Sequence, residues 1–249
     1  MNARILAIDA GNTRIKWGIY DGATWSLRGT IATADIADSE AFRDGLKASA
    51  ADRTVISNVA GSTVAKVIED KIRFLDKPIT CIAACASQCG VVNGYNVPAQ
   101  LGSDRWAALV AAHAAALDAP HPQLVVMSGT ALTVDALTAD GFFLGGIIVP
   151  GLMLMQRALN AGTAQLPSMP GQYQTFPGST VNAITSGALD ACAGAVQRMF
   201  VHLSDKTGDV PRCIGSGGTI DVLAQHLPFP VSINDNLVLD GLLVIAQAS

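Results

Sequence analysis

Two stretches of the chain share one pattern and lie about half a chain length apart. In each, a short apolar run leads into a glycine turn, then into a second run rich in β-branched residues, and then into an Asp-Gly pair. The first stretch covers residues 5–22 and the second covers residues 124–141. Such apolar runs predict strands, and an Asp-Gly pair between them predicts a hairpin. Because Gly11 and Gly129 lie 118 residues apart in a chain of 249 residues, we expect two similar halves.

The first glycine turn carries groups that suit a polyphosphate. Asp9 ends the predicted strand, and Gly11, Thr13 and Lys16 follow it closely. A tight turn points successive backbone N–H groups into a concavity that binds anions, while Thr13 adds a hydroxyl and Lys16 a cation. Since Asp9 would repel a phosphate, we expect a Mg²⁺ between them, held by Asp9 through water. An ordinary hairpin turn without a chemical role is the alternative.

Composition limits the class of protein. The chain is 50% apolar and only 14% charged, which predicts a well-buried globular protein. Its longest apolar stretch, Trp106–Leu117, is too short to span a bilayer. The N-terminus lacks the pattern of a signal peptide, so we expect a cytoplasmic protein without a membrane partner. A net charge of −4 with no Lys/Arg block argues against nucleic acid as the main partner.

The cysteines and histidines form no ligand motif. Cys81, Cys85 and Cys89 recur at every fourth position, but the chain has no Cys-x-x-Cys pair and no histidine near them. We therefore expect structural thiols rather than a metal site at these positions.

Strand and helix patterns alternate along the rest of the chain and predict an α/β architecture. A helical pattern from Thr180 to about Lys206 has a face of small residues, which would allow close approach of a helix from a second subunit. A buried helix within one subunit is the alternative. We expect a final helix, residues 237–246, to complete the second half.

A loop ends in Gly102-Ser103-Asp104-Arg105 at the start of an Ala-rich helical pattern, with Ser103 as the expected N-cap. Asp104 suits the positive end of the helix dipole, either as a surface acid or as the acceptor of a proton from a hydroxyl group. Arg105 at the same end needs an anionic partner, such as a substrate carboxylate. A further glycine-rich turn, Gly215–Gly218, joins a predicted strand to a helix and can lie under a nucleoside.

Together these segments resemble one family across nearly the whole chain: the type III pantothenate kinases of the acetate kinase, sugar kinase, Hsp70 and actin superfamily. The segments that carry the resemblance are Asp9–Lys16, Gly94–Arg105, Ser128–Asp135, Gly145–Gly151, Thr180–Gly187 and Gly215–Gly218. The resemblance implies an α/β fold of two similar ribonuclease H-like (actin-like) lobes. Each lobe would be a mixed sheet with flanking helices, and an ATP cleft would lie between them. We expect the lobes at residues 1–117 and 118–249, the second with the long dimerisation helix.

The function implied by the resemblance is ATP-dependent phosphorylation of pantothenate to 4′-phosphopantothenate, the first step of coenzyme A biosynthesis. Mg²⁺ would accompany ATP, and a cytoplasmic homodimer would share its active site between subunits. Two alternatives remain: another small-molecule kinase of the superfamily, or a nucleotide-binding regulator without catalytic activity.

The resemblance also implies a role for each residue of this chain that matches a family motif. Asp104 would be the catalytic base, and Asp9 would lie near Mg²⁺. The ATP-binding residues would be Asp9, Ala10, Gly11, Asn12, Thr13, Arg14, Ile15, Lys16, Gly129, Thr130 and Gly217. The substrate-binding residues would be Tyr95, Gly102, Ser103, Asp104 and Arg105, with Thr180 contributed by the partner subunit.

One position departs from the family pattern. The family has Asp-x-Gly-Thr in the second glycine turn, where the acid binds a monovalent cation such as K⁺ or NH₄⁺, but this chain has Met127 in place of that acid. Because a thioether is a poor ligand for a hard cation, we predict that activity depends weakly or not at all on K⁺. Rates in K⁺ and in Na⁺ at the same ionic strength measure this dependence, and strong activation by K⁺ would contradict the prediction.

Overall fold

The computed structural model describes residues 3–47, 50–162 and 171–248 of the chain. The chain forms two compact units. The first comprises Met1–Leu117 together with Asn236–Ser249, and the second comprises Asp118–Asp235. The first unit therefore contains both ends of the chain, and the second is one continuous segment.

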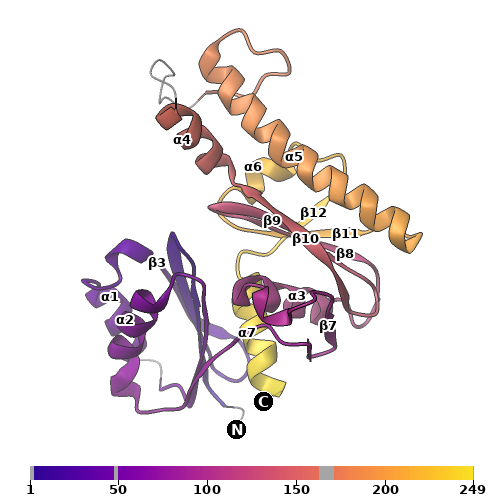
Figure 1. The fold of residues 1–249 in the computed structure, drawn as a ribbon. Coiled ribbons are helices and arrows are strands. Elements are labelled where there is room, and N and C mark those ends of the chain that lie inside the picture. Colours follow the sequence, from indigo (N-terminus) through magenta and orange to yellow (C-terminus); the bar gives the residue numbers. More distant parts are fainter. Residues whose placement is uncertain (1–2, 48–49, 163–170, 249) are drawn as a thin grey trace. The chain divides into compact units, whose positions relative to one another are not determined.

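The first unit is built on a sheet with the strand order β3-β2-β1-β4-β5 (Figure 1). Its strands are β1 (Ile5–Ala10), β2 (Arg14–Tyr20), β3 (Trp25–Ala32), β4 (Arg53–Asn58) and β5 (Ile79–Cys81). The first three strands form an antiparallel meander, whereas β4 runs parallel to β1 and β5 parallel to β4. Two short strands, β6 (Ser87–Gln88) and β7 (Val91–Asn93), form a hairpin. Single-turn helices η1 (Thr33–Asp35), η2 (Arg73–Leu75) and η3 (Pro98–Gln100) occur in the connections.

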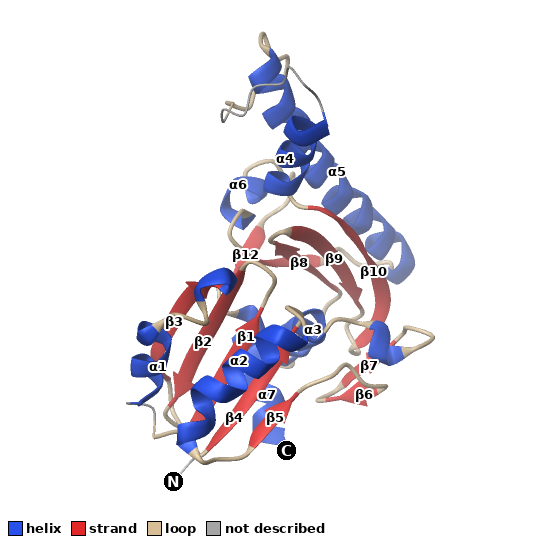
Figure 2. Cartoon of the chain, turned by 60° about the vertical axis from the view of Figure 1, so that its left-hand side comes forward, coloured by secondary structure: helices blue, strands red, loops and turns tan. Residues whose placement is uncertain are grey.

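The alternation of side chains in β1 separates the two faces of this sheet. Leu6, Ile8 and Ala10 belong to a hydrophobic core that includes buried residues of α1 (Glu40–Lys47) and α2 (Ser62–Ile72). The opposite face, to which Asp9 belongs, is covered by α7 (Leu237–Ala248) and α3 (Ser103–Ala115). In Figure 2, α2 lies in front of the strands and α7 behind them. Asp9 therefore lies on the face that carries α3.

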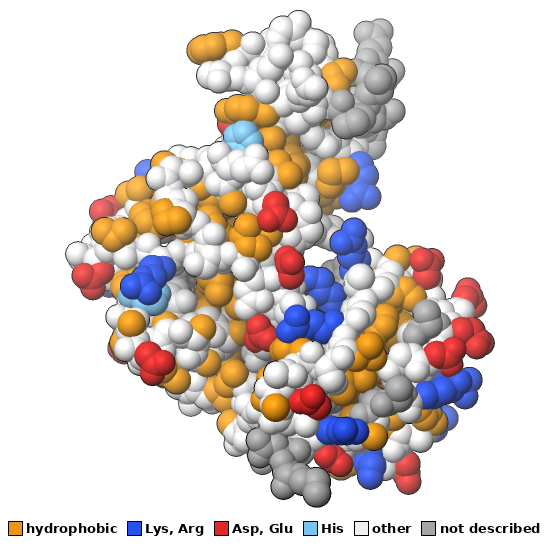
Figure 3. Space-filling model, turned by 180° about the vertical axis from the view of Figure 1, so that it is seen from behind, with side chains coloured by type: hydrophobic (Ala, Val, Ile, Leu, Met, Phe, Trp, Pro, Cys, Tyr) orange, Lys and Arg blue, Asp and Glu red, His pale blue; other side chains and the backbone are white. Residues whose placement is uncertain are grey.

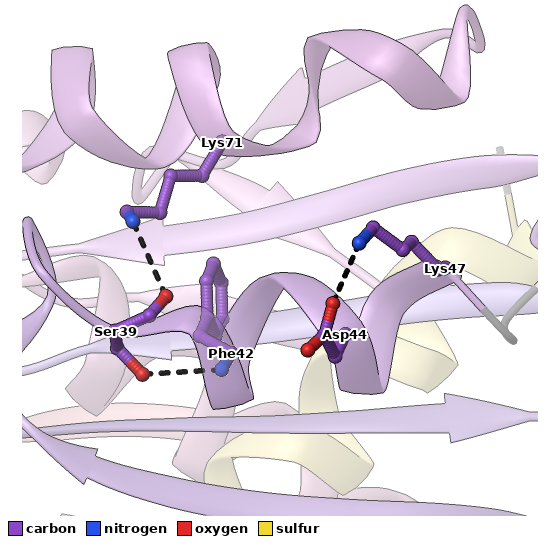
Figure 4. Close-up of polar contacts among 5 residues, drawn as sticks. All are labelled: Ser39, Phe42, Asp44, Lys47 and Lys71. Carbon is purple, nitrogen blue, oxygen red and sulfur yellow. Dashed lines mark hydrogen bonds and ion pairs between the residues drawn. The ribbon is translucent and has the colours of Figure 1, made fainter.

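Hydrogen bonds cap the N-terminus of α1 and connect this helix to α2 (Figure 4). The Phe42 backbone N–H donates to the hydroxyl of Ser39 over 3.1 Å, which caps the helix, and the Phe42 ring is fully buried. Lys71 of α2 donates to the carbonyl oxygen of Ser39 over 3.2 Å. An exposed ion pair joins Asp44 and Lys47 at 2.6 Å. The Lys71 hydrogen bond thus connects the two helices that cover one face of the sheet.

The second unit repeats the strand arrangement of the first. Its strands are β8 (Gln123–Ser128), β9 (Ala131–Leu137), β10 (Phe142–Pro150), β11 (Arg212–Ser216) and β12 (Val231–Ile233). Strands β8, β9 and β10 form an antiparallel meander, and β11 and β12 add parallel strands beyond β8. The Asp-Gly turns that close both meanders have positive φ angles, 101° at Gly22 and 85° at Gly141, which glycine adopts at little cost. The predicted repeat and the α/β fold with two mixed sheets are confirmed.

The described residues of the second unit include three helices: α4 (Leu152–Gly162), α5 (Thr180–Thr207) and α6 (Ile220–Ala224). Cys192 and Val196 of α5 and Ile220 of α6 pack on the apolar face of the sheet, in one core with Leu124 and Val126. None of the described helices is long and apolar enough to cross a membrane. On the face drawn in Figure 3, acidic and basic side chains are interspersed with apolar ones.

The last helix, α7, lies in the first unit, so the prediction that it completes the second half is wrong. Its buried residues Leu239 and Leu242 belong to the unit that contains β1 and α3, both of which α7 contacts. A Cβ atom on Gly241 would come within 1.8 Å of the carbonyl oxygen of Ala107, so glycine is needed for this close approach to α3. The sequence pattern predicts a helix here, but it does not specify the sheet that the helix covers.

We predict that Gly241→Ala lowers the free energy of unfolding by about 3 kcal/mol, because the new methyl group pushes α7 away from α3. Denaturant titration measures the change. Gly45→Ala in α1 is the matched control, since a Cβ atom there meets no atom nearer than 3.7 Å. The control should be neutral or stabilising by about 0.5–1 kcal/mol. Equal effects of the two substitutions would contradict the proposed packing.

Candidate active site

The first glycine turn joins β1 to β2 and is held by a residue beyond β3. The Gly11 N–H donates to the carbonyl oxygen of Arg14 over 3.1 Å, which closes the turn. Thr33 fixes it further, because its hydroxyl donates to the carbonyl oxygen of Gly11 over 2.7 Å and its N–H to that of Thr13 over 3.0 Å. Asn12, Thr13 and Arg14 are exposed at the tip. The turn therefore presents its backbone from a fixed position.

Not every residue of this turn can offer its side chain to a ligand. Ala10 and Ile15 are fully buried and belong to the hydrophobic core on the α1 and α2 face. If they contact ATP, they do so through backbone atoms.

Asp9 has acidic and basic neighbours within the first unit. It is paired in register with Lys16 of β2 on one side and with Ser57 of β4 on the other. The pKa of Asp9 is raised from 3.8 to about 7, chiefly by burial and also by the negative charge of Asp104, while the charge of Lys16 lowers it. The Oδ1 atom of Asp9 is enclosed and has no hydrogen-bond partner among the described residues. Asp9, Lys16 and Asp104 thus form one electrostatic cluster.

Asp104 lies in the first turn of α3. Burial raises its pKa, whereas the hydrogen bond from the Arg105 N–H, 2.8 Å from its Oδ1, and the charge of Arg105 lower it. Gly102 precedes the helix, and a Cβ atom there would come within 2.6 Å of the Asp104 Oδ1. Glycine at this position therefore leaves room for the carboxylate. Because a raised pKa makes a carboxylate a stronger base, Asp104 is suited to accept a proton.

The predicted substrate-binding residues of the first unit come together at the same helix start. Arg105 is buried, and its Nη1 donates to the hydroxyl of Tyr95 over 3.3 Å, with the guanidinium carbon 5.9 Å from the centre of the tyrosine ring. The Tyr95 N–H in turn donates to the side-chain oxygen of Asn93 over 3.0 Å. A buried guanidinium held in this way can bind a carboxylate.

The structure corrects one local prediction and adds one residue. Gly102, not Ser103, is the N-cap of α3, and Ser103 is the first residue of the helix. The Ser103 hydroxyl lies 2.9 Å from the hydroxyl of buried Ser57 at the end of β4. Sequence patterns do not identify Ser57, because a polar residue at the end of an apolar run indicates only a strand boundary.

The second glycine turn, in the second unit, is enclosed by two more glycines. The Gly151 N–H donates to the carbonyl oxygen of Thr130 over 2.9 Å, and a Cβ atom on Gly151 would come within 2.2 Å of the carbonyl oxygen of Gly129. On Gly217, whose φ is 112°, a Cβ atom would come within 2.3 Å of the carbonyl oxygen of Ser128. Three predicted ATP-binding residues, Gly129, Thr130 and Gly217, are thereby brought together.

Two other residues singled out from the sequence, Met127 and Thr180, also lie in the second unit. Met127 is paired in register with Thr133, whose buried hydroxyl has no hydrogen-bond partner among the described residues. Thr180 is exposed in the first turn of α5, where Ser179 is the N-cap and accepts a hydrogen bond from the Asn182 N–H.

The donor set of the first unit fits Mg²⁺. The Oδ1 atom of Asp9 is enclosed without a hydrogen-bond partner, and Asp104 interacts with the same carboxylate. No group of three or more His, Cys, Asp or Glu side chains suited to a metal occurs among the residues that the structure describes. Mg²⁺ typically takes one or two carboxylates and completes its shell with water and substrate phosphates, so a full protein cage is not required.

A cavity of about 220 Å³ lies elsewhere in the first unit. Its lining includes Ile56 and Ile68, which belong to the core on the α1 and α2 face. Since Asp9 lies on the opposite face, this cavity is not part of the candidate site.

Comparison with known proteins gives consistent results. Residues 5–202 match the family described as type III pantothenate kinase. A type III pantothenate kinase of Nitrosospira multiformis is 46% identical over 248 residues, which cover 99% of this chain and 92% of that protein. One of Aromatoleum aromaticum is 47% identical over 246 residues, which cover 98% of each chain.

A solved structure supports the fold. The inorganic polyphosphate/ATP-glucomannokinase of Arthrobacter sp. strain KM aligns over 100% of both chains with a TM-score of 0.52 and 18% identity. At this identity the likeness concerns the fold alone.

The raised pKa of Asp9 predicts a pH-dependent stability. Between 3.8 and about 7 the folded protein keeps a proton on Asp9 that the unfolded chain has released, so stability falls as the pH rises through this range. In Asp9→Asn we expect a smaller loss of thermal stability between about pH 5 and about pH 8 than in the wild type. Thermal melts at the two pH values measure this loss. Asp221→Asn, at an exposed position of α6, should keep the wild-type difference. An unchanged difference in Asp9→Asn would contradict the assignment.

Proposed function

The chain belongs to the type III pantothenate kinase family, and we propose that it transfers the terminal phosphoryl group of ATP to the hydroxyl group of pantothenate. The product is 4′-phosphopantothenate, and the reaction is the first step of coenzyme A biosynthesis. We place it in the cytoplasm, where ATP is available.

The observation that carries the assignment of roles is the electrostatic cluster of Asp9, Lys16 and Asp104. Two carboxylates raise each other's cost of ionisation unless a cation offsets their charge. One of them lies beside a turn that can bind phosphate, and the other lies at a helix start beside Arg105. This arrangement supports separate roles for the two acids at one reaction centre.

We assign Asp9 to the metal side of the reaction and Asp104 to the acceptor side. The glycine turn and Lys16 would hold the phosphates of ATP, and Asp9 would hold Mg²⁺ through water. The ion supplies positive charge that offsets the charge of the transferring group. The raised pKa of Asp104 supports its role as the base that takes the proton of the pantothenate hydroxyl.

In the transfer step, the hydroxyl oxygen of pantothenate forms a bond to the terminal phosphorus of ATP. The bond between that phosphorus and the leaving oxygen of ADP breaks, and the proton of the hydroxyl passes to Asp104. Arg105, next to the base and held by Tyr95, would bind the pantothenate carboxylate and orient the hydroxyl. Phosphoryl transfer depends mainly on such positioning and on charge neutralisation.

The alternatives have less support. A regulator without catalytic activity would not need Asp104 as a buried acid with a raised pKa at a helix start. Another small-molecule kinase would share the ATP-binding residues, so the acceptor decides between them. Pantothenate should be phosphorylated faster than other small alcohols.

We also propose a homodimer in which Thr180 completes the site of the partner subunit. The outer face of α5 carries the exposed small residues Ala183, Gly187, Ala191 and Gly194, and a Cβ atom on either glycine would meet nothing within 4 Å. A face of this kind allows a second helix to approach closely. Light scattering of the purified protein measures the oligomeric state, and a monomer would contradict this part of the proposal.

Asp104→Asn should lower the turnover rate of pantothenate by about 10²-fold or more, because the amide cannot accept the proton. Binding of ATP should persist, as measured by titration calorimetry. Glu40→Gln, another acid in the first turn of a helix of the same unit but exposed, should keep the wild-type rate. If Asp104→Asn turned over pantothenate at the wild-type rate, Asp104 would not be the base.

A further inference from the structure

We propose that Ser57 is a positioning residue of this kinase: its buried hydroxyl holds the start of α3 through Ser103 and thereby fixes Asp104 relative to Asp9. The inference rests on the proposed function, in which Asp104 is the base and Asp9 is the acid next to the metal. It adds a residue of β4 that is completely buried.

The strand register places Ser57 beside the cluster. Ser57 pairs with Asp9 across the parallel strands β1 and β4, and Lys16 pairs with Asp9 across the antiparallel strands β1 and β2. Side chains paired in register lie on the same face of a sheet. Ser57, Asp9 and Lys16 are therefore neighbours on the face that α3 covers.

The hydroxyl of Ser57 connects the sheet to the helix. Ser57 is completely buried, Ser103 is 8% exposed, and their hydroxyl oxygens lie 2.9 Å apart. The two residues are 46 positions apart in the chain, so the bond joins separate elements. Since a buried hydroxyl that loses its hydrogen-bond partner destabilises the fold, the pair favours one position for the helix start.

The bond completes a path of contacts between the two acids. The Val59 N–H donates to the carbonyl oxygen of Ala10 over 3.0 Å, which ties the end of β4 to the residue that follows Asp9. Ser57 then ties β4 to Ser103, the residue that precedes Asp104. Each acid is thus adjacent in sequence to a residue held by the end of β4.

The Ser57 bond is one of the contacts that set the separation of the two acids, because Asp104 directly follows the residue that this bond holds. The N-cap residue is Gly102, which has no side chain that could form a capping hydrogen bond with the helix start. Without the Ser57 bond, the first turn of α3 has one fewer restraint against moving away from the sheet.

The kinetic consequence is specific. A shift of the base by about 1 Å can cost up to about 10²-fold in rate, although ligand binding elsewhere persists. Ser57→Ala should lower kcat for pantothenate phosphorylation about tenfold and leave the KM for ATP unchanged. Thr54→Val is the matched control, since it also removes a buried hydroxyl from β4 but at a residue outside the proposed site. It should keep the wild-type kcat.

A double-mutant cycle tests whether Ser57 acts through Ser103. If the hydroxyl pair carries the effect, Ser57→Ala should lower kcat in the wild type but have no further effect in Ser103→Ala. Additive losses would show that Ser57 acts by another route and would overturn the inference. A wild-type kcat in Ser57→Ala would overturn it as well.

Hydrogen–deuterium exchange gives a second readout that does not depend on the reaction. Amides in the first turn of α3 should exchange faster in Ser57→Ala than in the wild type or in Thr54→Val, because the helix start is released. Unchanged exchange at this turn would overturn the inference. If the wild type fails to phosphorylate pantothenate, the proposed function fails instead, and the exchange result still decides whether Ser57 holds the helix.

Discussion

Two acids that repel each other are held close together in the first unit, and the candidate active site depends on this constraint. Asp9 is the penultimate residue of β1, and Asp104 lies in the first turn of a helix that covers the same face. Burial and mutual repulsion raise the pKa of Asp9 to about 7, so in the absence of ligand the pair is costly to ionise fully. A cation with ATP phosphates would relieve this cost. A cation bound there would thus favour the ionised form of Asp9 over the protonated form.

The duplicated strand arrangement gives each unit a glycine turn in an equivalent place. Both turns follow the first strand of an antiparallel meander, at Gly11 and at Gly129. The interactions that hold the two turns in place differ, however. Thr33 holds the first turn through hydrogen bonds, whereas Gly151 and Gly217 enclose the second through close backbone contact. The two turns therefore share a topology but not the interactions that stabilise it.

The sequence predicted those parts of the structure that depend on local pattern. Strand alternation and turn residues located both meanders, and the position of Asp104 and Arg105 in the first turn of a helix was visible from residue order alone. The packing of α7 in the first unit was not predictable, because the apolar pattern of a helix does not specify which sheet the helix covers. The Ser57–Ser103 bond was also missed, since it joins residues 46 positions apart whose proximity depends on the whole fold. The N-cap was misassigned for a related reason: Ser103 is an ordinary capping residue, but its hydroxyl has a partner in the sheet.

The position of α7 has a consequence for how the chain is made. The first unit needs Leu237, Leu239 and Leu242 to cover its sheet, yet these residues follow the entire second unit in the chain. On the ribosome, the second unit, being continuous, can assemble as soon as its own residues emerge. The first unit already has α3 by then, but it waits for α7 to complete the cover of one face of its sheet. The acidic pair of the candidate active site lies on the face that α7 completes, so this site is among the last regions of the chain to mature.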